Sequence, residues 1–199
     1  MTKGRKTAKK SQSVKKLAIG GILTALVVVL QMMGSFVKFG PFAISLVLIP
    51  IVLGAALCDY KTSTWLGFIF GVVVLFTDAA AFLAVSVPGT IITVLVKGTL
   101  CGLAAGLVYK AFEKVNRYVA VVAAALVCPI VNTGIFLLGC AVFFLDTIRE
   151  WGGAAGFTNV AQFLIVGMVG INFVIELSVN IFLSPIVVRL LDFSKKINK

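Results

Sequence analysis

Residues 90–112, TIITVLVKGTLCGLAAGLVYKAF, form one apolar run that is long enough to cross a lipid bilayer. About 20 residues that each rise 1.5 Å cover the roughly 30 Å hydrocarbon core. Lys97 lies inside the run, and Gly98, Gly102 and Gly106 follow at four-residue intervals. The glycines therefore share one stripe where a neighbouring helix can approach closely. A cation in such a helix indicates a functional site; the alternative is that Lys97 only pairs with a buried acid.

The composition of the whole chain indicates that residues 90–112 are one of several membrane-spanning segments. The 199 residues are 60% hydrophobic and only 13% charged, and the mean hydropathy is +1.13. Apolar runs of membrane-spanning length recur along the chain, which predicts an all-α, multi-pass membrane protein with one domain. We predict six spans, at residues 14–34, 42–58, 63–77, 90–112, 118–144 and 160–191.

The two ends of the chain are basic. We predict a disordered cytoplasmic leader at residues 1–13, a six-helix substrate-binding domain at 14–192 and a basic cytoplasmic tail at 193–199. The leader runs into a full-length span without a small-residue cleavage site, so we expect a retained anchor and not a signal peptide.

The distribution of basic residues predicts the orientation. With six spans the termini share one side, and that side holds fifteen of the 18 Lys and Arg residues. The opposite side holds only Lys38 and Arg149, so the positive-inside rule places both termini in the cytoplasm. The tails fit attraction to anionic lipid headgroups, and we expect no nucleic-acid partner because no reader motif accompanies them.

Several chemistries lack their usual residues. The chain has no histidine, and its four cysteines form no CxxC pair, so zinc, haem and Ser-His or Cys-His catalysis are disfavoured. No Walker-type glycine-rich loop is present, which excludes ATP hydrolysis by this chain. We therefore expect a binding component that is not an enzyme and that has no cofactor or metal.

Polar residues within the spans predict a binding pocket. Counting helix rise from the outer ends places Lys97 roughly 10 Å deep and Asn132 and Asn172 roughly 18 Å deep. Buried polar groups need partners, so these residues are expected to converge on one pocket with aromatic walls, open to the outside. The substrate-binding candidates are Gln31, Asp78, Thr93, Lys97, Asn132, Asn172 and Glu176.

These candidates have structural alternatives. The two asparagines could equally bridge helices. Glu176 could be the counter-ion of Lys97, which would leave the pocket neutral; otherwise Lys97 favours a carboxylate or phosphate on the ligand. For Asp78, a structural role at a helix end or in holding a lid is favoured.

Two other segments carry predictions. The apolar connection at residues 78–89 is predicted to be a lid over the cavity, the alternative being an extension of the third helix. In the first span, Ala18, Gly21 and Ala25 form a smooth strip that suits helix contact, either inside the protein or with a partner. Pro50 is predicted to kink the second span.

Together these features resemble the substrate-specificity (S) components of energy-coupling factor (ECF) transporters, over roughly residues 14–192. The most specific parts are Lys97-Gly98 with the following glycines, and Pro129-Ile-Val-Asn132-Thr133. The basic leader, the strip in the first span and the apolar third loop add to the resemblance.

The resemblance implies a function. Such proteins capture a vitamin or related micronutrient in an outward-facing pocket capped by the first and third loops. They then associate with a transmembrane coupling subunit and two cytoplasmic ATPases, and release the ligand by toppling in the membrane. The family's Ala-x-x-x-Ala coupling motif matches Gly21 and Ala25, with Gly in place of the first Ala.

The ligand stays open at this stage. The family pocket draws on the fourth to sixth helices, which matches Lys97, Asn132, Asn172 and Glu176, and a riboflavin, pantothenate or folate type ligand would each suit it. The rival hypotheses are an integral-membrane enzyme that uses Lys97, Asp78 and Glu176, and a structural membrane protein without a ligand.

Overall fold

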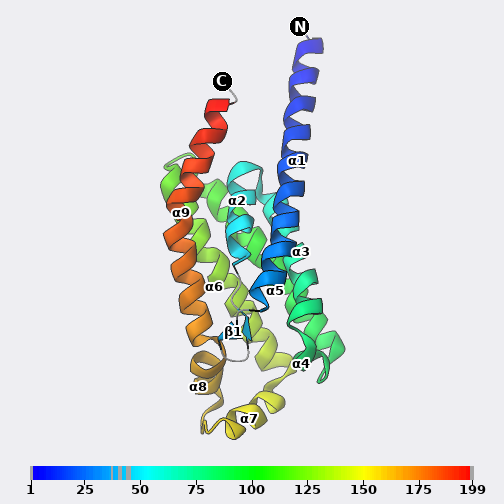
Figure 1. The fold of residues 1–199 in the computed structure, drawn as a ribbon, viewed down its shortest axis with the longest axis vertical. Coiled ribbons are helices and arrows are strands. Elements are labelled where there is room, and N and C mark those ends of the chain that lie inside the picture. Colours follow the sequence, from blue (N-terminus) through cyan, green and yellow to red (C-terminus); the bar gives the residue numbers. More distant parts are fainter. Residues whose placement is uncertain (1, 37, 40–41, 44–45, 198–199) are drawn as a thin grey trace.

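The computed structural model describes residues 2–36, 38–39, 42–43 and 46–197 as a bundle of helices that run along its long axis (Figure 1). The long helices are α1 (Thr2–Gly34), α3 (Tyr60–Thr77), α5 (Val87–Phe112), α6 (Arg117–Phe143) and α9 (Ile171–Ile197). The shorter elements are β1 (Lys38–Phe39), β2 (Phe42–Ala43), α2 (Leu48–Leu57), α4 (Ala80–Leu83), α7 (Leu145–Ala154), α8 (Val160–Gln162) and the π-helical segment η1 (Phe163–Gly170).

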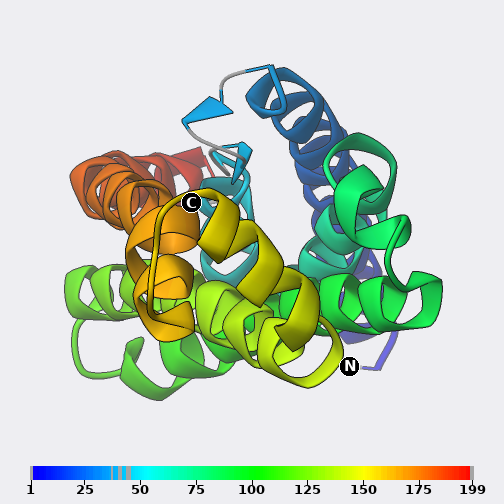
Figure 2. The ribbon, with the colours of Figure 1, turned by 90° about the horizontal axis from the view of Figure 1, so that it is seen from below.

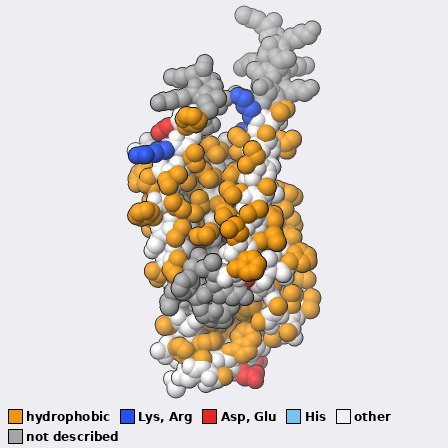
Figure 3. All heavy atoms as spheres, in the orientation of Figure 1, with side chains coloured by type: hydrophobic (Ala, Val, Ile, Leu, Met, Phe, Trp, Pro, Cys, Tyr) orange, Lys and Arg blue, Asp and Glu red, His pale blue; other side chains and the backbone are white. Residues whose placement is uncertain are grey.

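Both ends of the chain lie at one end of the bundle, as Figure 1 shows. The short helices α4, α7 and α8 lie toward the opposite end. Viewed from that opposite end, α7 crosses in front of the bundle (Figure 2). In Figure 3 hydrophobic side chains cover the middle of the visible face, and Lys and Arg lie near the end that carries the termini. An apolar belt with charges at the ends is the surface that a bilayer requires.

Five of the six predicted spans have a helix that can cross a membrane by length and composition: Ser13–Gly34, Tyr60–Thr77, Val87–Phe112, Arg117–Phe143 and Asn172–Phe193. The second span, predicted at 42–58, does not. Its first residues form β2, which pairs antiparallel with β1, and α2 has only ten residues, or about 15 Å. Seven of the ten residues of α2 are buried among the other helices.

The kink predicted at Pro50 is wrong. Pro50 is the third residue of α2 and lies in its first turn. The N–H groups of a first helical turn have no partner inside the helix, so a proline there costs no hydrogen bond. Pro50 therefore helps to begin a short helix, where the sequence analysis expected it to bend a long one.

The leader and the last span also differ from the predictions. The structure begins α1 at Thr2, although residues 1–13 were predicted to be disordered; Lys and Ala favour helix, and extending a helix already formed needs no new nucleus. The predicted span at 160–191 is divided into α8, η1 and α9. Hydropathy carries no signal for the change from α- to π-type main-chain hydrogen bonds.

The glycines of α5 pack directly against α3. A Cβ atom added at Gly98 would overlap the carbonyl oxygen of Gly67, and one added at Gly102 would overlap that of Ser63. At Gly71 it would lie 2.8 Å from the carbonyl oxygen of Val94. The prediction that the glycine stripe lets a neighbouring helix approach closely is confirmed, and α3 is that neighbour.

Candidate substrate cavity and partner-facing helix

The candidate site is a cavity of about 90 Å³ between the long helices. Since one water molecule needs roughly 10–15 Å³ on this measure, the cavity has room for several waters or for part of a small organic molecule. All seven substrate-binding candidates from the sequence line it: Gln31, Asp78, Thr93, Lys97, Asn132, Asn172 and Glu176. They come from α1, the end of α3, α5, α6 and α9, so five distant parts of the chain converge there.

Lys97 is deeper than the sequence analysis estimated. Because α5 begins at Val87, three residues before the predicted start, Lys97 lies ten residues from the N-terminal end of the helix, or about 15 Å along the axis. Its Nζ lies 5.5 Å from the ring centroid of Phe70 and 5.3 Å from that of Phe136. Cation–π contacts of this kind stabilise an ammonium group that has left water.

Two carboxylates, those of Asp78 and Glu176, line the same cavity as Lys97. Ion pairs among the described residues include Lys16–Asp59 at 3.1 Å, Arg117–Asp192 at 4.0 Å and Arg149–Asp146 at 3.1 Å, all outside the cavity lining. Lys97 lines the cavity, and an ammonium group can donate hydrogen bonds to a molecule bound there.

Gln31 and Asp78 hold together the rim of the cavity at the end of the bundle opposite the termini. The side-chain amide of Gln31 donates a hydrogen bond of 2.7 Å to Asp78 Oδ2, which also accepts one of 2.9 Å from the hydroxyl of Thr77. This ties the end of α1 to the end of α3, which is a structural contact different from the helix cap or lid contact predicted for Asp78. Asp78 also faces the cavity, so the two roles coexist.

Four polar atoms around the cavity are buried without a hydrogen-bond partner among the described residues: Gln31 Oε1, Asp78 Oδ1, Thr93 Oγ1 and Asn132 Oδ1. The residues Gln31, Thr93 and Asn132 are only 3%, 4% and 5% exposed. An unsatisfied buried polar atom costs roughly 1–3 kcal/mol, so such atoms rarely gather unless something else satisfies them. Their location around one cavity indicates a ligand or bound water.

Segment 78–89 borders this cavity and does not extend α3. Asp78 ends α3, and the short helix α4 then places Phe82 against the cavity. The Phe82 ring makes edge-to-face contacts with Phe136, Phe144 and Trp151, at centroid distances of 5.7, 5.0 and 5.5 Å. The alternative of an extended third helix is therefore wrong.

Sequence reasoning missed much of the apolar lining. The additional lining residues are Val74, Ala79, Phe82, Thr90, Val94, Thr133, Phe136, Phe144, Met168, Val169 and Phe173. The prediction of aromatic walls named no residue, because a cavity phenylalanine has the same sequence signal as one that faces lipid or core. Helical spacing did offer a signal for Thr90, Val94 and Phe136, since they lie one turn from the candidates Thr93, Lys97 and Asn132.

The small residues of α1 separate into two faces. Gly20 lies toward α3, since a Cβ added there would be 3.6 Å from Thr62 Cγ2. Ala18, Gly21 and Ala25 are exposed, and a Cβ added at Gly21 would have no atom within 4 Å. The predicted contact strip is therefore open to the outside of the protein.

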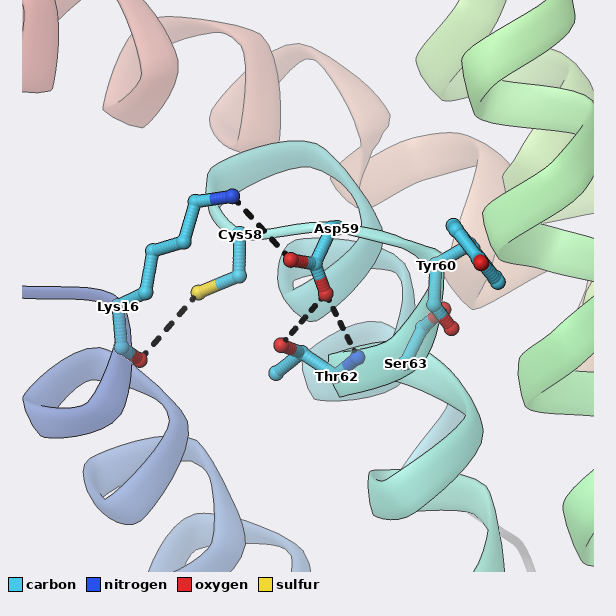
Figure 4. A network of polar contacts seen from close by, with 6 residues as sticks. All are labelled: Lys16, Cys58, Asp59, Tyr60, Thr62 and Ser63. Atoms are coloured by element: carbon cyan, nitrogen blue, oxygen red, sulfur yellow. Dashed lines mark hydrogen bonds and ion pairs between the residues drawn. The ribbon is translucent and has the colours of Figure 1, made fainter. Parts of the chain in front are cut away.

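A polar cluster anchors α1 beside this face (Figure 4). Lys16 Nζ pairs with Asp59 Oδ2 at 3.1 Å, and Asp59 Oδ1 accepts hydrogen bonds from the N–H and the hydroxyl of Thr62 at 2.9 and 3.0 Å. Burial tends to raise the pKa of Asp59, but these hydrogen bonds and Lys16 outweigh it and lower the pKa below its usual value. Burial, with the adjacent Asp59, raises the pKa of the Cys58 thiol. The cluster caps α3 and joins it to α1.

Replacing Asp59 with alanine is expected to lower the free energy of unfolding by about 1 kcal/mol, because α3 loses its N-cap. The Asp59 pKa is lowered in the fold, so the stabilisation is present above the unfolded pKa of about 4 and disappears as the pH falls through the folded value. Thermal unfolding in detergent at pH 7 and near pH 3 measures both effects, with the exposed Asp192→Ala as control. An unchanged melting temperature of Asp59→Ala at pH 7 would contradict the assignment.

Comparisons with known proteins supply the last observation. The family model described as "ECF transporter, substrate-specific component" matches residues 15–188. The search of curated proteins and the search of solved structures each found no match.

Proposed function

Since the chain belongs to the family of substrate-specific components of ECF transporters, we propose that it captures a water-soluble vitamin or related micronutrient from outside the cell. The family makes it a substrate-specific subunit of a membrane transporter, and the resemblance seen in the sequence is confirmed. The observation that carries the finer proposal is the cavity with four buried oxygen atoms, of Gln31, Asp78, Thr93 and Asn132, that have no hydrogen-bond partner among the described residues. The ligand we propose is of the riboflavin, pantothenate or folate type.

The proposed partners follow from the separate roles of the subunits in such a transporter. This chain supplies the binding site, a transmembrane coupling subunit receives it, and two cytoplasmic ATPases supply the energy. The exposed face of Ala18, Gly21 and Ala25 is the proposed contact with the coupling subunit. We place both termini in the cytoplasm; the charge distribution and their location at one end of the bundle support this orientation.

Purification of the protein alone in mild detergent, followed by mass spectrometry of the small molecules it releases, tests the binding function. A vitamin-like compound in a one-to-one ratio with the protein is the expected result. If none is released, thermal-shift measurements with a vitamin panel follow. The absence of any stabilisation by that panel would count against the proposal.

Replacing Lys97 with methionine is expected to weaken binding of that compound about 10- to 100-fold, because the ammonium donors are lost while the apolar stem remains. Isothermal titration calorimetry measures the change. Lys110→Met is the matched control, since Lys110 also lies over a ring, that of Tyr60 at 5.2 Å, but does not line the cavity. If Lys97→Met and the unmodified protein bind the compound with equal affinity, Lys97 does not contribute to ligand binding.

A further inference from the structure

The rim of the cavity at Gln31 and Asp78 presents hydrogen-bond acceptors. Gln31 Nε2 donates to a carboxylate oxygen of Asp78, and a carboxylate can only accept there. This contact fixes the orientation of the Gln31 amide, so its other atom, the buried Oε1, is an acceptor as well. Together with Asp78 Oδ1, two acceptor oxygens without a partner among the described residues lie at this rim.

The charges of the cavity also favour a ligand group that donates hydrogen bonds at the rim. Its ionisable lining residues are one cation, Lys97, and two carboxylates, Asp78 and Glu176, so its formal charge is −1. A carboxylate on the ligand placed at the Asp78 rim would meet like charge in a medium of low dielectric, where repulsion is strong. An ammonium group could instead donate to both rim oxygens, and each hydroxyl group could donate to one of them.

The deeper part of the cavity has a different chemistry. Lys97 offers N–H donors and Asn132 Oδ1 offers a buried acceptor. Asn132 lies eleven residues from the C-terminal end of α6 and Lys97 ten residues from the N-terminal end of α5, so their main chains lie at similar depths. Phe136 and Phe173 line the cavity with them. A donor, an acceptor and aromatic walls suit the amide-like edge of a flat heterocycle.

We infer that the cavity takes a flat heterocycle with an amide-like edge, held near Lys97 and Asn132, whose hydroxyl-bearing or ammonium-bearing tail hydrogen-bonds to Gln31 and Asp78. The ligand is neutral or cationic, and its tail carries no carboxylate. This inference rests on the proposed binding function and narrows it to one class of substrate.

The test offers the purified protein an equimolar mixture of riboflavin, thiamine, pantothenate and folate, and identifies the retained compound after gel filtration by mass spectrometry. Riboflavin is neutral and thiamine cationic, and both join a ring to a hydroxyl-bearing tail. Folate has a ring with a carboxylate tail, and pantothenate has a carboxylate and no ring. Retention of riboflavin or thiamine is the expected result. Preferential retention of pantothenate or folate would overturn the inference but leave the binding function standing, whereas retention of none would count against both.

Variants of the rim provide the second readout. Asp78→Asn is expected to weaken binding of the retained compound at least tenfold, because the negative charge is lost and one of the two acceptor oxygens becomes an NH2 donor. The control Asp146→Asn, at an exposed site on α7 outside the cavity, is expected to change nothing. If Asp78→Asn does not fold, Thr93→Val removes another buried cavity oxygen without changing the shape of the side chain, and it is expected to weaken binding too. Unchanged affinity in the folded variant would overturn the inference.

Discussion

A valine at Gly98 is expected to disrupt the packing of α5 on α3 and to lower the free energy of unfolding by about 3 kcal/mol or more. The main chains approach so closely at this point that even one added carbon would overlap the carbonyl oxygen of Gly67. Backbone atoms cannot move aside as a flexible side chain can, so the two helices would have to separate along the interface that Gly67, Gly71 and Gly102 share. This separation would also displace Lys97, which directly precedes Gly98 in the chain and lines the cavity.

Thermal unfolding in detergent measures the effect of Gly98→Val. The matched control is Gly134→Val on α6, since a Cβ added at Gly134 would have no atom within 4 Å. If the valine variant yields no folded protein, Gly98→Ala adds a single carbon and is expected to show a smaller loss in the same direction. Equal melting temperatures of Gly98→Ala, Gly134→Ala and the unmodified protein would show that the close approach of α3 and α5 is not needed for stability.

A leucine at Gly21 is expected to abolish assembly with the coupling subunit while leaving ligand binding within about twofold of the unmodified protein. The Gly21 position is open, so the added side chain causes no overlap within this chain. It would nevertheless stand on the smooth face of Ala18 and Ala25, where a partner helix needs small residues to approach closely. Structure and binding should therefore be preserved when assembly is lost.

Co-expression with the coupling subunit and the two ATPases, followed by affinity purification through this chain, measures assembly. Gly134→Leu again serves as control, because it places the same side chain at another open glycine, on α6. Calorimetry with the compound identified by mass spectrometry shows whether binding survives. Co-purification of the coupling subunit with the Gly21→Leu variant at the level of the unmodified protein would exclude this face as the contact.

Several features were readable from the sequence for one physical reason, the cost of placing polar groups in hydrocarbon. Long apolar runs had to be membrane helices, and five of the six predicted spans have a helix of the required length. A polar residue in such a run had to turn inward, which is why Lys97, Asn132 and Glu176 could be grouped before any contact was known. The glycine spacing predicted a close helix contact because four residues make about one turn.

Other features depended on the tertiary structure. Small residues on α1 are equally suited to an internal and an external neighbour, and only the packing of α3 on Gly20 leaves Gly21 on the open face. The aromatic lining could not be named, because Phe82 and Phe144 have the same hydropathy as phenylalanines that face lipid. The length of α2 depends on the hairpin before it and on burial among the other helices, neither of which local composition encodes.

The sequence by itself determined that this is a multi-pass helical membrane protein with inward-facing polar residues, because the bilayer imposes that pattern on every segment separately. The tertiary structure alone decided which apolar residues line the cavity where these polar residues meet, and which acceptor oxygens there lack a partner among the described residues. Both properties depend on distances between segments far apart in the chain. Those distances follow from how all the helices pack together, and no single segment specifies them.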